Sequence, residues 1–307
     1  MRSIRYLCLA LVVSACSSDF DPPYRLLSLR VLAMQSEPVA PAAGETSSLS
    51  ALVYTLPGVD VDRYAWSWCP FPGPASEGYP CLVDEAQLDE LGPAADSIPP
   101  FDLGSGDTAS FPHTIDPELL TALCTGVDDQ PAAVDCATGF PVQLKLTVTA
   151  GDEEITAVRE LRLRFADEHE ANANPTIDGM VAVVGDDEEE LGDAPGPRLP
   201  RLEESTVRID VPLEASETFT GEDERGEPQT ERERLIVSWF VETGTIDDEQ
   251  TAFIDGLVDL DAALTNTWEP EDVGGYPRDQ ADMVVVVRDN RNGVTWRRGA
   301  AALEDEP

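Results

Sequence analysis

The sequence predicts an all-β protein in which two antiparallel β-sandwiches follow one another along the chain. Three observations favour this fold class. Apolar and polar residues alternate over many short segments, which is the period of a half-buried strand. Gly (22) and Pro (25) are together more frequent than in an average protein, which indicates many turns. No segment keeps the helical period for more than about ten residues, and strands and helices do not alternate as they do around a parallel sheet.

The first element is an export signal. Residues 1–16 read MRSIRYLCLALVVSAC, in which two arginines precede a short apolar stretch. This stretch is far too short to cross a bilayer as a permanent helix, which needs about 20 residues. It ends in Val13-Ser14-Ala15-Cys16, which resembles the lipobox of bacterial lipoproteins, where small residues precede an obligatory cysteine. The resemblance implies cleavage after Ala15 and lipidation of Cys16; a plain secretory signal with an incidental cysteine is the alternative.

We therefore expect residues 1–15 to be a signal peptide and residues 16–24 to be a lipidated tether. Several acyl chains on one residue hold a folded domain at a bilayer, because each buried CH₂ contributes about 0.8 kcal/mol. Ser17, rather than Asp, follows the cysteine, which is similar to lipoproteins that are forwarded to the outer membrane. The expected location is therefore the cell envelope, with a lipid anchor in the outer membrane. No other segment approaches about 18 consecutive apolar residues, so no membrane-spanning helix is expected.

The first sandwich is expected over residues 25–166. Its strands are predicted by alternation in four segments, at residues 27–32, 49–53, 64–68 and 142–165. The last of these is a hairpin that turns at Ala150-Gly151-Asp152. Between the third and fourth segments the chain is rich in Pro, Gly and Asp. Two short helices are expected there, at Glu85–Leu91 and Pro117–Leu123.

A polar segment that ends in Asn174-Pro175 separates the two halves, and we interpret residues 167–175 as the interdomain linker. The second sandwich is expected over residues 176–303, followed by an acidic tail at residues 304–307. Its strands are predicted at residues 177–184, 207–211, 235–241, 283–287 and 294–297. Acidic loops are expected at residues 185–200 and 214–233, and Asn292-Gly293 is a strong signal for a hairpin turn.

Four cysteines follow the expected lipidation residue: Cys69, Cys81, Cys124 and Cys136. An even number in an exported chain predicts disulfides. The first two are twelve residues apart and so are the last two, which favours two short loops among three possible connectivities. A zinc site with four cysteine ligands is the competing interpretation, but the close Cys-x₂-Cys spacing of such sites is missing.

The two halves repeat one order of elements: an opening strand, an alternating strand, a Trp-bearing strand and a closing hairpin. With this order the chain resembles tandem immunoglobulin-like domains of bacterial surface lipoproteins. The resemblance is carried by Leu29–Ala33, Glu37-Pro38, Pro41–Glu45 and Trp66–Pro70 in the first half, and by Asn174–Ile177, Val237–Phe240 and Val287–Asp289 in the second. It implies two such sandwiches and no particular activity. The cysteines do not occupy the positions of the usual inter-sheet disulfide, so we expect them to staple loops, with Trp68 and Trp239 central in the two cores.

The charge of the chain excludes one class of partner. Asp and Glu number 60 against 20 Lys and Arg, which gives a net charge of −40, and Lys145 is the only lysine. A field of this sign repels phosphate backbones, so no nucleic-acid binding is expected. Most of the acidic side chains are expected to face water. A surface that attracts cations is the sharper alternative to one that is merely soluble.

No catalytic residue and no cofactor are expected. The two histidines, His113 and His169, lie in loop or linker context and are expected to be solvated. The motifs of zinc proteases, α/β-hydrolases and P-loop nucleotide-binding proteins are missing. Asp186–Glu190 and Asp247–Glu249 offer hard oxygens to Ca²⁺, but contiguous acids lack the spacing of an EF-hand and are more often a solvated loop. We therefore expect no metal site.

These observations predict a non-enzymatic, lipid-anchored envelope protein. Its membrane contact is the N-terminal lipid, and its two sandwiches are expected to bind, or to interact structurally with, an unidentified protein or glycan. The alternative is a carbohydrate-binding surface module that stacks sugars on exposed indoles, for which Trp66, Trp268 and Trp296 are the candidates. An envelope hydrolase with an unfamiliar site is a third and less supported class.

Overall fold

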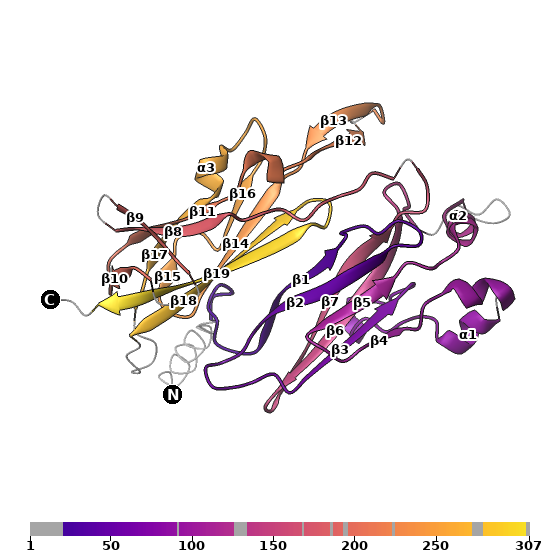
Figure 1. The fold of residues 1–307 in the computed structure, drawn as a ribbon, viewed down its shortest axis with the longest axis horizontal. Coiled ribbons are helices and arrows are strands. Elements are labelled where there is room, and N and C mark those ends of the chain that lie inside the picture. Colours follow the sequence, from indigo (N-terminus) through magenta and orange to yellow (C-terminus); the bar gives the residue numbers. More distant parts are fainter. Residues whose placement is uncertain are drawn as a thin grey trace, which may run out of the picture.

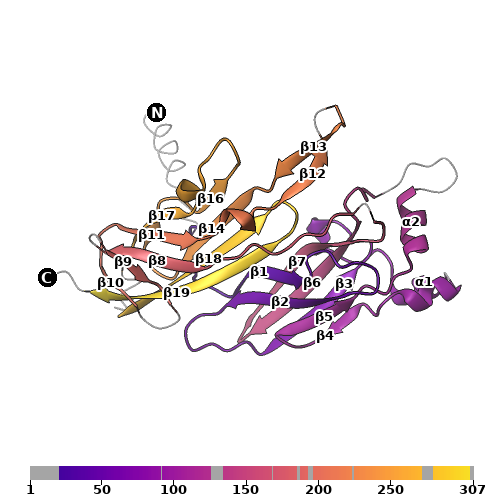
Figure 2. The ribbon, with the colours of Figure 1, turned by 45° about the horizontal axis from the view of Figure 1, so that its top comes forward.

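The computed structural model describes residues 21–90, 92–125, 134–167, 169–184, 187–192, 196–222, 225–271 and 279–304. The expected signal peptide, the lipidation residue Cys16 and the last three residues lie outside them. Figure 1 shows two β-rich units beside each other along the long axis, and Figure 2 shows the same arrangement from a second direction. The prediction of an all-β fold is confirmed. Within the described residues, no helix is both long and apolar enough to cross a membrane.

The first unit is a sandwich of two antiparallel sheets. A three-stranded sheet has the order β1 (Arg30–Glu37), β2 (Thr46–Tyr54), β5 (Thr108–Pro112). The facing sheet has the order β4 (Asp102–Gly104), β3 (Arg63–Cys69), β6 (Phe140–Ala150), β7 (Glu153–Leu163). The first, second and fifth strands of the chain thus form one sheet and the other four form the second. This division is the one expected of an immunoglobulin-like sandwich.

The central strand β6 shows why these residues form a sheet. Its sequence, FPVQLKLTVTA, buries every second side chain, because the side chains of a strand point alternately to opposite faces. The buried set packs with Trp66 and Trp68 of β3 in one apolar core. The predicted hairpin is confirmed, since Ala150 pairs with Glu153 across the turn. Gly151 in this turn has a φ of 57°, which favours glycine.

Short helices occupy the irregular stretch between β3 and β6. They are η1 (Ala75–Glu77), α1 (Glu85–Asp89), η2 (Gly92–Ser97) and α2 (Pro117–Thr125). α1 begins at a capping box, in which Gln87 N donates to Asp84 Oδ1 at 2.8 Å and Asp84 N donates to Gln87 Oε1 at 2.9 Å. Both predicted helices are therefore confirmed, with α1 ending at Asp89 and α2 at Thr125.

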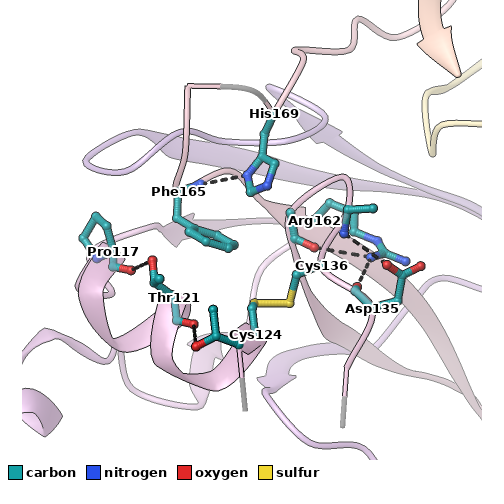
Figure 3. Close-up of a disulfide and its surroundings, with 11 residues drawn as sticks. Pro117, Thr121, Cys124, Asp135, Cys136, Arg162, Phe165 and His169 are labelled. Carbon is teal, nitrogen blue, oxygen red and sulfur yellow. Dashed lines mark hydrogen bonds between the residues drawn. A yellow bond between two sulfur atoms is a disulfide. The ribbon is translucent and has the colours of Figure 1, made fainter. Parts of the chain in front are cut away.

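Two disulfides lie in the same stretch. Cys69 is joined to Cys81 and Cys124 to Cys136, with a separation of 12 residues in each pair. This is the short-loop connectivity that the spacing favours. Figure 3 shows the second bond between the end of α2 and the segment before β6, close to Arg162 of β7. Neither bond joins one sheet to the other, so the cores are held by packing.

The second unit is also a sandwich. One sheet has the order β10 (Arg198–Pro200), β19 (Val294–Glu304), β18 (Gln280–Asp289), β14 (Leu235–Val241), β16 (Gln250–Phe253). The other has the order β15 (Thr245–Ile246), β17 (Thr265–Glu269), β11 (Ser205–Asp210), β8 (Gly179–Val184), β9 (Asp187–Glu190). Two short helices, η3 (Leu213–Ala215) and α3 (Leu260–Ala263), lie in its connections. All pairs of neighbouring strands are antiparallel except β10 with β19, which run parallel.

The two expected acidic loops contain strands instead. β9 and β10 lie in the first, and the second forms a hairpin of β12 (Thr218–Glu222) and β13 (Pro228–Arg232). Figures 1 and 2 show this hairpin projecting from the second sandwich. These strands carry many exposed polar side chains because they lie at sheet edges or in a hairpin of their own. The apolar alternation that predicts a half-buried strand is therefore missing from them.

A third apolar cluster joins the two sandwiches. It consists of Leu26, Leu32, Ala33, Leu52, Tyr54, Val284, Val286 and Val294, with Phe240 and Trp296 packed against it. One face of β1 and β2 therefore packs on the outer face of β14, β18 and β19. β18 is apolar on both faces for this reason, because Val285 faces the core of its own sandwich while Val284 and Val286 face the first sandwich.

Candidate functional site

The segment expected to be a linker is hydrogen-bonded to the second sandwich. Asn172 is only 8% exposed, and its Nδ2 donates to Asp289 Oδ2 and to Arg291 O, both at 3.1 Å. Arg291 in turn donates a hydrogen bond to the linker, from its Nη2 to Ala171 O at 2.7 Å. The described part of the linker is therefore packed along the turn between β18 and β19.

The same segment also bonds to the first sandwich. Asn174 Nδ2 donates to Ser36 O at 2.9 Å and to Glu37 Oε2 at 2.7 Å. Its Oδ1 accepts from Val294 N, in the second sandwich, at 2.9 Å. Gln35 adds a direct bond from its Nε2 to Val294 O at 2.6 Å. One linker side chain thus connects β1 with β19.

The turn between β18 and β19 is the centre of this junction. Asp289 Oδ1 accepts from Arg291 N and from Gly293 N, both at 2.7 Å, which closes the turn. Asn292 has a φ of 77°, in agreement with the predicted Asn-Gly turn. A Cβ on Gly293 would lie 2.0 Å from Asp289 Oδ2 and 2.8 Å from Ala173 O, so no larger residue fits where turn and linker touch. Burial raises the pKa of Asp289.

Beside this turn the two sandwiches form a cavity of about 260 Å³. Its lining residues include Arg159 of β7 and Arg288 of β18. Arg159 donates from Nη1 to Met34 O and from Nη2 to Asn292 O, so its side chain bridges the two sandwiches. Arg288 Nη2 donates to Leu32 O at 2.6 Å, which is a second bridge. Burial lowers the pKa of Arg159 to about 10.

A buried ion pair holds the base of the β12–β13 hairpin. Glu233 is fully buried, and its Oε1 lies 3.2 Å from Arg291 Nη1. Its Oε2 accepts from Glu217 N at 2.9 Å. Burial, with the negative charge of Asp289 as the second cause, raises the pKa of Glu233 to about 7. The Arg291 guanidinium also lies 5.0 Å from the ring centre of Phe219 in the hairpin itself.

Both histidines are buried, so the expectation that they are solvated is wrong. His113 is fully buried, and its Nε2 lies 3.1 Å from Arg164 O. Burial lowers the pKa of His113. His169 is 6% exposed and packs edge-on against Phe165 with ring centroids 4.6 Å apart, as Figure 3 shows. Both rings are packed side chains of the first sandwich and its exit into the linker.

The tryptophans do not form an exposed surface for stacking sugars. Trp68 and Trp239 lie in the two cores, as predicted, and Trp66 and Trp268 are equally buried. The indole nitrogens of the latter two donate to backbone carbonyl oxygens at 3.0 Å. Trp296 is half-buried against the third apolar cluster. The expectation of an exposed indole is therefore wrong for Trp66 and Trp268.

Among the residues that the structure describes, the acidic segments do not gather into a metal site. β9 lies at the edge of its sheet, and because it is a strand its successive acidic side chains point to opposite faces. Arg208 donates to Glu188 from Nη1 to Oε1 at 2.7 Å and from Nη2 to Oε2 at 3.0 Å. Arg297 Nη2 donates to Glu190 Oε1 at 2.9 Å. Over the part of the chain that the structure describes, no group of three or more His, Cys, Asp or Glu could hold a metal ion. Asp186 lies outside that part.

Sequence reasoning missed the junction, although two signals point to it. Arg159 shares a strand face with Ala157 and Leu161, so a charge interrupts an otherwise apolar face. Residues 283–287, which precede Arg288, are apolar on both faces of the strand, whereas apolar and polar residues alternate along a strand that has one solvent-exposed face. Together they indicate that a further layer covers these strands, but not which part of the chain supplies it.

No protein-family model and no curated protein matches the sequence. Solved structures similar to this chain include fibronectin(III)-like modules of CbhA from Clostridium thermocellum (12% identity, 89% of this chain and 95% of that chain covered, TM-score 0.23). Others are murine CEACAM1b (10%, 89% and 99%, 0.23) and the D00-D0 domain of Intimin (12%, 91% and 99%, 0.23). The assignment of two immunoglobulin-like sandwiches rests on the strand order of this chain itself.

Proposed function

We propose that this chain is a non-enzymatic, lipid-anchored envelope protein whose two sandwiches act as one unit and bind an unidentified protein partner. The observation that carries the proposal is the domain junction. There an apolar cluster and bonds from Arg159, Asn174 and Arg288 connect the two sandwiches. Two modules joined in this way hold their outer loops at a set separation and angle. Such an arrangement suits a module that binds a partner at a distance from a membrane.

The lipobox at Val13–Cys16 supports the anchor, and the first described residues support its position. Leu26 N donates to Val241 O at 2.9 Å, and Val241 N donates to Tyr24 O at 3.0 Å. Cys16 and Tyr24 are eight positions apart, which spans at most about 28 Å of extended chain. A lipid on Cys16 would therefore hold the second sandwich close to the bilayer.

Fractionation of cells that express two cysteine variants tests the anchor. Cys16→Ser removes the thiol that would carry the lipid, whereas Cys8→Ser changes a cysteine inside the signal peptide and is the matched control. We expect wild type and Cys8→Ser in the outer-membrane fraction and Cys16→Ser outside it. Mass spectrometry of the N-terminal peptide is expected to show an acylated Cys16. Membrane-bound Cys16→Ser would contradict the anchor.

The charge of the chain defines the cross-linking chemistry that identifies the partner. Lys145 is the only lysine, against 60 Asp and Glu. A carbodiimide, which couples carboxylates to lysines, therefore joins this protein to a partner far more readily than to itself. We expect one defined adduct in intact cells that weakens as ionic strength rises, because an acidic surface attracts a basic partner. A smear of adducts that excess unlabelled protein does not reduce would contradict a specific partner.

A further inference from the structure

We propose that the cavity between the sandwiches is a binding site for a small oxyanion, a carboxylate or a phosphate, held by Arg159 and Arg288. This site goes beyond the proposed function, because it depends neither on the lipid anchor nor on the protein partner. It is built from both sandwiches, since Arg159 lies on β7 and Arg288 on β18.

Arg159 and Arg288 both line the cavity. Arg159 donates to Met34 O and Arg288 donates to Leu32 O, and these two acceptors are two residues apart on β1. Residues two apart on one strand are separated by roughly 7 Å. Each guanidinium therefore lies within reach of one small ligand that is placed between them. The turn residue Asn292, which also accepts from Arg159, forms a further part of the wall.

Neither arginine has an acidic partner among the described residues: no carboxylate oxygen there lies within 4.0 Å of their nitrogens. Some other arginines of this acidic chain have such a partner, as in the pairs of Arg25 with Glu271 and Arg208 with Glu188. Arg232 and Arg298 instead donate to backbone carbonyl oxygens. Two unpaired guanidinium groups in a half-enclosed space are unexpected in a protein with a net charge of −40. Positive charge that is buried without a counter-charge costs free energy, and a bound anion would remove that cost.

Among the described residues that line the cavity, the one acidic side chain already accepts hydrogen bonds. Asp289 accepts from Asn172 Nδ2 and from the backbone nitrogens of Arg291 and Gly293. One carboxylate also cannot balance two guanidinium groups, so the cavity keeps an excess of positive charge. The lowered pKa of Arg159 agrees with this, because burial is its main cause and the charge of Asp289 only partly opposes it.

Donors remain for a ligand. A guanidinium has five N–H groups, and the Nε of Arg159 and of Arg288 takes part in no hydrogen bond within the described residues. Planar guanidinium groups bind the paired oxygens of carboxylates and phosphates through two parallel bonds. Val31, Ala157 and Val294 are among the other lining residues, and the space of about 260 Å³ is large enough for a small anion.

Thermal unfolding of the detergent-solubilised full chain tests the site. Inorganic phosphate, acetate and succinate are titrated at constant ionic strength set with sodium chloride. We expect a saturable rise in melting temperature with phosphate or with a carboxylate, because a ligand that binds only the folded state stabilises it. The arm with the larger rise identifies the class of ligand. No rise with any of the three overturns the proposal.

Three variants test whether the rise in melting temperature depends on the two cavity arginines. In Arg159→Gln and Arg288→Gln we expect the apparent affinity for the anion to fall at least about tenfold, since each removes a charge-assisted bond. Arg63→Gln, at an exposed position of β3, is the control and is expected to keep the wild-type affinity. An equal rise in both cavity variants and wild type overturns the proposal. Should either variant fail to fold, calorimetry on wild type decides, because the site requires saturable binding of one anion per chain.

Discussion

Asn172 Nδ2 lies 3.1 Å from Asp289 Oδ2, so the segment between the two sandwiches is bound to a hairpin turn that comes more than 100 residues later in the chain. This contact brings together the linker, the turn and, through Asn174, the first strand of the other sandwich. The linker therefore contributes to stability as well as to connectivity.

Asn172→Ala is expected to lower the free energy of unfolding by about 1–2 kcal/mol, because it removes the buried amide that donates to Asp289 Oδ2 and to Arg291 O. Urea denaturation followed by tryptophan fluorescence measures this. Asn290→Ala is the control, since Asn290 is an exposed residue of the same turn that accepts one bond from Arg234 N. An equal fall in the free energy of unfolding of the two variants would show that the contact of Asn172 with the turn stabilises the fold no more than an exposed hydrogen bond does.

Gly293→Ala is expected to lower the free energy of unfolding by about 2 kcal/mol or more, because the added methyl overlaps Asp289 and the carbonyl of Ala173. Gly192→Ala is the matched control. A Cβ there meets no atom within 4 Å, and its φ is not left-handed, so a change within about 1 kcal/mol is expected. Thermal melting of both variants checks the contrast, and a stable Gly293→Ala would mean that turn and linker do not touch.

Glu233→Gln is expected to remove the part of the pH dependence of the free energy of unfolding that comes from protonation of Glu233. The pKa of Glu233 is raised from 4.5 to about 7, so the folded state binds this proton more tightly than the unfolded chain. Its contribution to stability is therefore full below about pH 4.5 and is lost as pH rises through about 7. Between about pH 5 and about pH 8, wild type should lose up to roughly 3 kcal/mol relative to the variant.

Urea denaturation across this pH range measures the difference between wild type and Glu233→Gln. Asp289, Glu217 and Arg291 face the same carboxyl group and are present in both proteins, so their own titration largely cancels. Glu203→Gln, at an exposed position, is expected to leave the pH profile unchanged. Parallel profiles for wild type and Glu233→Gln would contradict a proton held on Glu233 near neutral pH.

Removing one disulfide, by changing Cys69 and Cys81 to Ser together, is expected to cost about 3 kcal/mol, because a short closed loop restricts the unfolded chain. The same change at Cys124 and Cys136 is expected to cost a similar amount. Peptide mapping without reduction should recover only these two pairs. Any peptide that joins one pair to the other would contradict the connectivity.

Local patterns predict much of the fold. The alternation along Phe140–Ala150 and the turn after it predict the longest hairpin, and the structure has both. Asn292-Gly293 predicts the turn that the structure places between β18 and β19. In contrast, the sequence pattern predicts a loop at the strand Asp187–Glu190, because all four of its residues are acidic and exposed at the sheet edge and none is apolar.

Local sequence patterns alone predict that the chain is all-β, that it divides into two sandwiches and that its cysteines pair over short loops. Those features depend on spacing within about a dozen residues, where period, turn chemistry and loop closure act directly. The lipid on Cys16 stays a prediction. The burial of His113 and Trp268, and the position of Arg159 and Arg288 in the lining of one cavity, follow only from how the folded chain packs. The reason is physical: a strand's pattern shows that a face is covered, whereas the identity of the covering surface depends on contacts between distant parts of the chain.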